Sequence, residues 1–137
     1  MEPWAVYLII GFFVFDILLV VWILYKKSRA RVFAAGELQY IKSHWIRIID
    51  RFSSHSKEAI LDADKLLDYA LSRKGFEGSL GEKLKAAGPK FSDINSVWEA
   101  HKLRNKIAHE LADLSDGEAK RALSNFKKAL NDLGANL

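Results

Sequence analysis

An uninterrupted apolar run near the start of the chain constrains the fold more than any other feature. It extends from Trp4 to Tyr25 and contains one charged side chain, that of Asp16. A helix rises about 1.5 Å per residue, so the run would extend about 33 Å and could cross a hydrocarbon layer of about 30 Å. A buried core helix of this length would be excessive for 137 residues. We therefore expect one transmembrane helix over residues 4–25, inside an anchor formed by residues 1–29.

The flanks of the run support this interpretation and predict its orientation. A cleavable signal peptide would need basic residues before the run and small residues after it, and the chain has neither. Aromatic side chains typical of the membrane–water interface lie at both ends, namely Trp4, Tyr7, Trp22 and Tyr25. A basic cluster follows, formed by Lys26, Lys27, Arg29 and Arg31, whereas the other flank offers only Glu2. The positive-inside rule therefore predicts an N-terminus outside and a cytoplasmic domain.

Asp16 lies near the middle of the predicted membrane helix. An acid at that depth costs about 2.5–3.5 kcal/mol on insertion scales, which the surrounding apolar side chains can offset. It either pairs with another membrane helix, including a second copy of this one, or is tolerated because it is protonated or reaches water. The sequence leaves both interpretations open.

The rest of the chain is basic and free of cysteine. All 21 Lys and Arg residues lie after Tyr25, whereas two of the 17 acidic residues precede it, so residues 26–137 carry a net charge of +6. The absence of Cys excludes a disulfide framework, a Cys-based zinc site and a Cys nucleophile. The length allows one compact domain beside the anchor and excludes a multidomain enzyme.

Apolar residues recur at helical spacing throughout this domain. The spacing predicts long helices over 30–52, 57–74 and 93–111, and a last one that ends at Gly134. A short helix is expected between Ser79 and Gly88-Pro89. Ser56, and either Ser92 or Asp93, are expected N-caps, and Ser79 with Glu82 and Ser115 with Glu118 form expected capping boxes. We therefore expect an all-α fold over residues 30–137, an up-and-down four-helix bundle with one extra short helix. The membrane helix either continues through Gly36 or bends between Ser28 and Gly36.

One run in the 93–111 helix carries recognisable chemistry. It reads WEAHKLRNKIAHE from Trp98 to Glu110, with Arg104-Asn105 followed by His109. This run resembles the RNxxxH signature of the HEPN superfamily, small helical-bundle domains of toxin, abortive-infection and RNA-processing systems. The helix order is also similar, because the motif lies late in the penultimate long helix and one capped amphipathic helix follows. The resemblance covers about residues 57–133 and does not include the anchor.

The resemblance implies a metal-independent endoribonuclease that acts as a homodimer and needs no cofactor. His109 would be the general acid or base at the RNA 2′-hydroxyl and the leaving oxygen, Arg104 would stabilise the phosphate, and Asn105 would orient the site. An imidazole titrates near neutral pH, and a guanidinium can hold a phosphate through two hydrogen bonds. A toxin or defence role would add a regulatory or antitoxin protein as a partner.

The spacing of the motif raises a geometric problem. Five positions turn a helix through about 500°, which leaves Arg104 and His109 about 140° apart. Either the arginine side chain crosses the helix surface, or the helix ends near His109, or two subunits build one cleft. His101, Asn105 and His109 do share a face. The apolar seam of residues 30–52, together with the membrane tether, is expected to favour the homodimer.

Less specific interpretations fit the same residues. Arg104 can pair with an acid of the 57–74 helix (Asp62, Asp64 or Asp68), and His109 can simply favour the carbonyl end of its helix. The domain would then be a non-catalytic dimerisation, nucleotide-binding or protein-binding module. Lys102, Lys106, His101 and Arg121, with Lys120 nearby, form either an RNA-binding rim or an ordinary solvated face. A metal site is not expected, because only Asn105 lies between His101 and His109 on their shared face.

Overall fold

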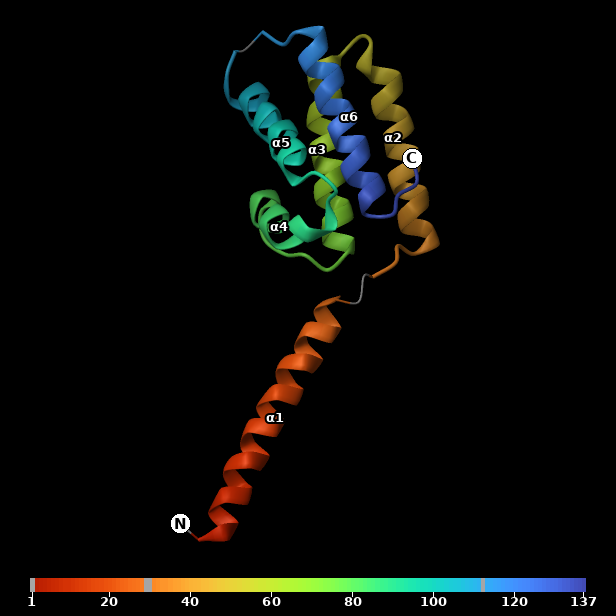
Figure 1. Cartoon of the computed structure of the whole chain (residues 1–137). Helices are drawn as coiled ribbons and strands as arrows, with labels where there is room; N and C mark the ends of the chain where they lie inside the picture. Colours follow the sequence, from red (N-terminus) through yellow and green to blue (C-terminus); the bar gives the residue numbers. More distant parts are fainter. Residues whose placement is uncertain (1, 29–30, 112) are drawn as a thin grey trace. The chain divides into compact units, whose positions relative to one another are not determined.

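The computed structural model describes residues 2–28, 31–111 and 113–137, in two compact units formed by residues 1–31 and 32–137 (Figure 1). The chain is 79% helical, with six α-helices and no strand among the described residues. This confirms the prediction of an all-α fold. The predicted interface residues Lys26, Lys27 and Arg29 have side chains outside the described part of the chain.

The first unit contains the helix α1 (Pro3–Ser28). Its residues Pro3–Tyr25 are long enough and apolar enough to cross a membrane, by length and composition. Pro3 is compatible with the first turn, where its missing N–H would have no helical partner. Large apolar side chains are exposed along the whole helix, and the side chain of Asp16 is half-buried among them. A helix that is apolar on all its faces needs a non-aqueous environment.

A non-helical segment, residues 31–34, precedes α2, which spans Ala35–Phe52. The interpretation of one continuous helix through Gly36 is therefore wrong. Phe33 is 6% exposed and belongs to the hydrophobic core, with the Lys74 Nζ atom 4.1 Å from its ring centroid. The Glu37 carboxylate accepts a hydrogen bond from the Ala34 N–H at 3.0 Å. Burial of Phe33 and this cap explain why the helix begins later than the predicted residue 30.

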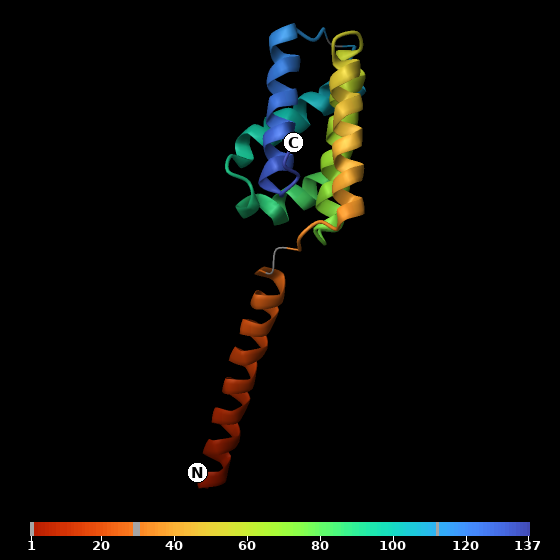
Figure 2. The same cartoon turned by 90° about the vertical axis from the view of Figure 1, so that its right-hand side faces the viewer.

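The second unit is built around α3 (Ser56–Arg73), which contacts α2, α4, α5 and α6. α5 (Ile94–His109) packs on α3 and on α6 (Asp116–Asp132), while α2 packs on α3 (Figures 1 and 2). The short helix α4 (Leu80–Ala87) and the 3-10 helix η1 (Gly88–Lys90) lie at the end of the unit where α3 ends. The largest fully buried side chains are Phe126, Ile41, Ile60, Leu67, Leu71, Leu84 and Leu130.

The apolar seam of α2 is part of this core. Ile41, Trp45 and Ile48 are at most 6% exposed, and Leu38 and Phe52 pack against the same cluster. The seam therefore packs within its own chain, mainly on α3, and is not free to join two copies. The expectation that this seam favours a homodimer is wrong, because α3 already covers it.

The predicted helix caps are mostly confirmed. Ser79 with Glu82 and Ser115 with Glu118 form capping boxes, and the Asp93 side chain accepts the Ser96 N–H at the start of α5. The N-cap prediction at Ser56 is wrong, because His55 holds that position and Ser56 is already helical. Hydrogen bonds from the Ser79 and Ser115 backbone N–H groups, followed by those from their hydroxyls, lower the pKa of Glu82 and Glu118 respectively.

Candidate functional site

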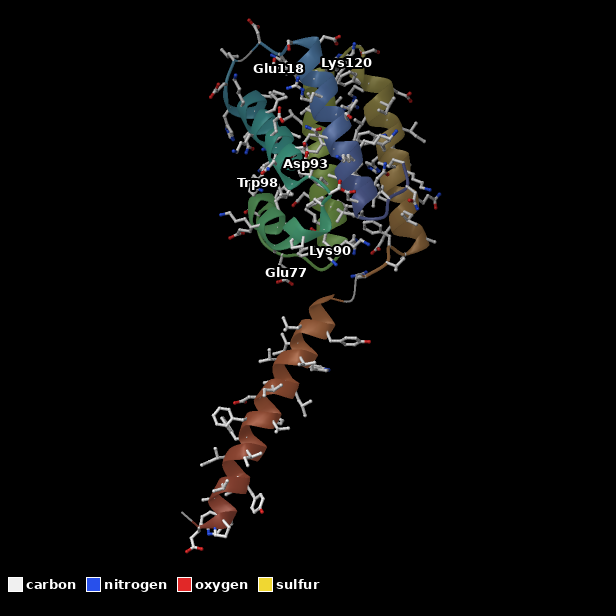
Figure 3. The ribbon with its side chains drawn as sticks, viewed as in Figure 1. Glu77, Lys90, Asp93, Trp98, Glu118 and Lys120 are labelled. Carbon is white, nitrogen blue, oxygen red and sulfur yellow. The ribbon has the colours of Figure 1, made fainter. Side chains whose placement is uncertain are left out.

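α5 positions the motif residues against α3. Val97 and Ala100 are buried on the core side of α5, and Trp98 lies on the side that faces α4 (Figure 3), where a Cβ on Gly81 would lie 3.7 Å from its ring. These contacts fix the rotation of α5 about its own axis. The following turns therefore carry His101, Arg104 and Asn105 at half-buried positions.

Asp64 of α3 is the buried partner of two motif-helix side chains. Its side chain is 5% exposed, and its Oδ1 atom lies 2.8 Å from the His101 Nδ1. Its Oδ2 atom lies 3.1 Å from the Arg104 Nε. That Nε is buried, and its N–H direction does not meet hydrogen-bond geometry with any described residue, so the contact is an ion pair. Asp64 is one of the three acids that the sequence offered to Arg104.

The arginine side chain also bends toward the neighbouring face of α5. Its Nη1 donates to the Asn105 Oδ1 at 2.9 Å, and the Asn105 Nδ2 lies 3.4 Å from the His101 Nε2. Because the amide oxygen accepts from arginine, the amide nitrogen is the donor toward His101. His101 therefore accepts at Nε2, and its proton is on Nδ1, which donates to Asp64.

His109 is the last residue of α5, whose C-cap Glu110 is already extended. The helix therefore ends two residues before the predicted end. The His109 side chain is exposed and makes no hydrogen bond or ion pair with any described residue. It lies one turn beyond Asn105 on the same face. Two of the three arrangements considered for the motif thus occur in one chain, because the Arg104 side chain crosses to Asn105 and the helix ends at His109.

Arg104 and His101 line an open cavity of ≈ 440 Å³ between α3, α5 and the start of α4. Its wall includes Asp64, Lys65 and Ser79, but not Asn105 or His109. Within a single chain the cavity and the exposed imidazole are therefore separate features. No group of three or more His, Asp or Glu side chains that could hold a metal ion occurs among the residues that the structure describes.

The predicted RNA-contact residues divide between two cavities. Lys102, Lys106 and Arg121 line a second cavity of ≈ 270 Å³ between α5 and α6, whereas His101 lines the first. Two acids line the second cavity as well: Glu99 lies 3.5 Å from the Arg121 Nη1, and Glu118 is the capping residue of α6. Lys120 pairs instead with Asp116 at 2.7 Å. The fold thus brings three predicted cations together, one cation in excess of the two acids.

Two polar features of the domain were not predicted from the sequence. Lys83 of α4 is 7% exposed at its side chain, and its Nζ contacts the Asp68 Oδ1 at 2.8 Å and the Ser72 Oγ at 2.7 Å. On α2 and α3, Tyr40 with His44 and Tyr69 with Arg73 form ring contacts. The four-residue spacing within each pair could have predicted these ring contacts, because such residues are neighbours on a helix surface. A buried lysine has no such local signal.

No protein-family model matches the chain, and no curated protein or solved structure matches it.

Proposed function

We propose that this chain is a single-pass membrane protein with a cytoplasmic HEPN-like domain, a homodimeric and metal-independent endoribonuclease. In this proposal the N-terminus lies outside, α1 spans the bilayer, and α2, α3, α5 and α6 form an up-and-down four-helix bundle with α4 as the extra helix. The apolar helix α1 and the basic cluster after Tyr25 support the topology.

The observation that carries the proposal is the position of the Arg104 guanidinium. It lies against Asn105, on the α5 face that continues to the exposed His109, which pairs with none of the residues that the structure describes. A phosphate bound along this face would meet a permanent cation at one end and an imidazole at the other. His109 would transfer the proton of the 2′-hydroxyl or of the leaving oxygen, and Arg104 would stabilise the charge on the phosphate.

The ion pair with Asp64 is compatible with this role. Asp64 engages only the Nε of Arg104, and the arginine side chain remains 26% exposed. Its Nη2 donates to no residue that the structure describes. A guanidinium held from its inner side and open on its outer side is preorganised for an anion, because its position is set before the ligand arrives.

A second copy would complete the site beside His109. Leu111, two residues after His109, is fully exposed and is therefore available for a contact with a second copy. A two-fold contact at this end of α5 would bury Leu111 and bring two His109 side chains to one groove. The anchor α1 favours that contact because it holds all copies in one plane.

The alternative is a non-catalytic dimerisation, nucleotide-binding or protein-binding module tethered to the membrane. One observation favours it: the Asp64 carboxylate already balances the charge of Arg104 through one oxygen and contacts the His101 Nδ1 through the other. In that case the motif would stabilise the packing of α5 on α3, and His109 would have no chemical task.

Cleavage of RNA by the full chain in lipid nanodiscs separates these functions. The reaction contains EDTA, and it compares wild type with His109→Ala and with His55→Ala, an exposed histidine between α2 and α3. We expect His109→Ala to be at least about 100-fold slower, since general acid–base catalysis contributes about 10²–10⁴. We expect His55→Ala to cleave like wild type. If dimeric wild type does not cleave, the non-catalytic module is the correct function, and if His109→Ala cleaves like His55→Ala, catalysis by His109 is refuted.

A further inference from the structure

A groove between α2 and α3 contains no residue of α5, and it shares only Lys65 with the cavity that Arg104 and His101 line. Its cavity measures ≈ 230 Å³. The floor is apolar, formed by Ile48 and Leu66, each 3% exposed. The rim is cationic, with Arg47, Arg51 and Lys65 on the two facing helices. An apolar floor with a few polar groups at its edge is typical of small-ligand sites.

A column of three contacting aromatic rings lines this groove. The Tyr40 ring stacks on His44 with centroids 3.8 Å apart, and it lies 4.3 Å from the Tyr69 ring. Two rings cannot stack on one face of a third, so His44 and Tyr69 cover opposite faces of Tyr40. The Arg73 guanidinium lies 5.3 Å from the Tyr69 centroid and adds a cation–π contact to the column.

The exposed face of this column belongs to His44. Its Nδ1 donates to the Tyr40 carbonyl at 2.9 Å, because a carbonyl can only accept, and this bond fixes the ring. One face of its ring covers Tyr40, and the half-buried His44 side chain lines the groove. A planar ring inserted over the apolar floor would stack there, extending the column by one member.

The charge on the rim matches an anion. Arg51 pairs with Asp62 at 2.9 Å, and the Lys65 Nζ is 4.0 Å from the same carboxylate. Arg47 makes no ion pair with any described residue. Three cations thus face one carboxylate around the cavity. This excess favours a negatively charged group close to an aromatic surface, which is the combination that single-stranded nucleic-acid sites use.

We propose that the α2–α3 groove binds a nucleotide unit, with the base stacked on His44 above Ile48 and Leu66 and the phosphate held by Arg47 and Lys65. A cavity of ≈ 230 Å³ accommodates a base, and the sugar and phosphate lie outside at the cationic rim. The same chemistry is offered by a free mononucleotide and by one residue of an RNA strand. The site does not depend on RNA cleavage, because it involves α2 and α3 instead of α5.

Equilibrium binding to the full chain in nanodiscs tests the proposal. One arm uses AMP, followed by calorimetry, and the other uses a fluorescein-labelled 2′-O-methyl oligoadenylate, which lacks the 2′-hydroxyl needed for cleavage. Inorganic phosphate serves as the competitor. The variants are His44→Ala and the double variant Arg47→Glu/Lys65→Glu. The matched control is the double variant Lys127→Glu/Lys128→Glu, which reverses two exposed charges on α6. Circular dichroism confirms that each variant is folded.

We expect His44→Ala to weaken binding about tenfold, within the range of about fivefold to a hundredfold that base stacking contributes. We expect the groove double variant to weaken it about as much, because it replaces both phosphate-holding cations with carboxylates. The control should bind like wild type. Binding of AMP identifies a free nucleotide as the ligand, and binding of the oligonucleotide alone identifies an RNA strand. The proposal is overturned if neither ligand binds at concentrations up to about 1 mM, the upper end of typical KM values. It is also overturned if phosphate competes as well as AMP does, or if His44→Ala binds like wild type.

Discussion

The buried carboxylate of Asp64 offers the sharpest test of the packing of α5 on α3. Asp64→Asn keeps the size of the side chain and removes its charge. An amide is uncharged and has one acceptor oxygen, so either the His101 Nδ1 donor loses its acceptor or the Arg104 guanidinium loses the carboxylate oxygen of its ion pair. A buried donor without an acceptor costs about 1–3 kcal/mol. Arg104 is 26% exposed and can recover some hydration, so we expect a loss of about 2 kcal/mol, or roughly a thirtyfold change in the folded-to-unfolded ratio.

Asp62→Asn is the matched control, because it is the same substitution on the same helix. Asp62 pairs with Arg51 through side chains that are 38% and 53% exposed. Such surface pairs contribute little, so we expect a loss below about 0.5 kcal/mol. Urea unfolding of the full chain in detergent micelles, followed by circular dichroism, measures both. If the two variants unfold within about 0.5 kcal/mol of each other, the reasoning about the Asp64 network is refuted.

Three further predictions concern stability. Lys83→Met should change the free energy of unfolding by less than about 1 kcal/mol, because Asp68 is 43% exposed and stays hydrated. Asp68→Asn should cost about 2 kcal/mol, because it leaves the buried Lys83 ammonium without its carboxylate. Urea unfolding should show this order of the two variants, and the reverse order would contradict the prediction. Glu82 and Glu118 have a folded-state pKa below the ordinary 4.5, so their contribution to folding stability is present above that pH and is lost as the pH falls below it. Thermal unfolding should therefore show a smaller acid-induced fall in Tm for the double variant Glu82→Gln/Glu118→Gln than for wild type. Equal falls in Tm would contradict this. A fragment of residues 32–137 should be soluble and unfold cooperatively without detergent, since the core residues all lie within it; aggregation or a gradual thermal transition would contradict this.

The helices that could be predicted well are those whose ends are set by local contacts. Ser79 with Glu82 and Ser115 with Glu118 lie three residues apart, so the cap can be read directly from the sequence. The start of α2 could not be read in this way. It depends on Phe33, which enters the core and is 6% exposed. The periodicity alone cannot reveal that a tertiary contact has taken an apolar residue out of the helix.

In the candidate site, too, the features set by local sequence could be predicted and those set by tertiary packing could not. The positions of His101, Asn105 and His109 on one face follow from helical spacing alone. The partner of Arg104 depends on how α3 and α5 are aligned, which no local pattern specifies. The sequence offered Asp62, Asp64 and Asp68. A closer reading of α3 would have favoured Asp64, because it lies on the stripe of Ile60, Leu67 and Leu71 that faces the core.

The chemistry of the RNA ends most directly tests the claim that His109 and Arg104 act on one phosphate. Attack by the 2′-hydroxyl, with proton transfer by His109, must leave a 2′,3′-cyclic phosphate on one fragment and a 5′-hydroxyl on the other. Mass spectrometry of RNA incubated with the wild-type chain and EDTA should find these ends, and they should be missing with His109→Ala and Arg104→Ala. Fragments with 3′-hydroxyl and 5′-phosphate ends, or the cyclic ends at equal yield from both variants, would contradict the account.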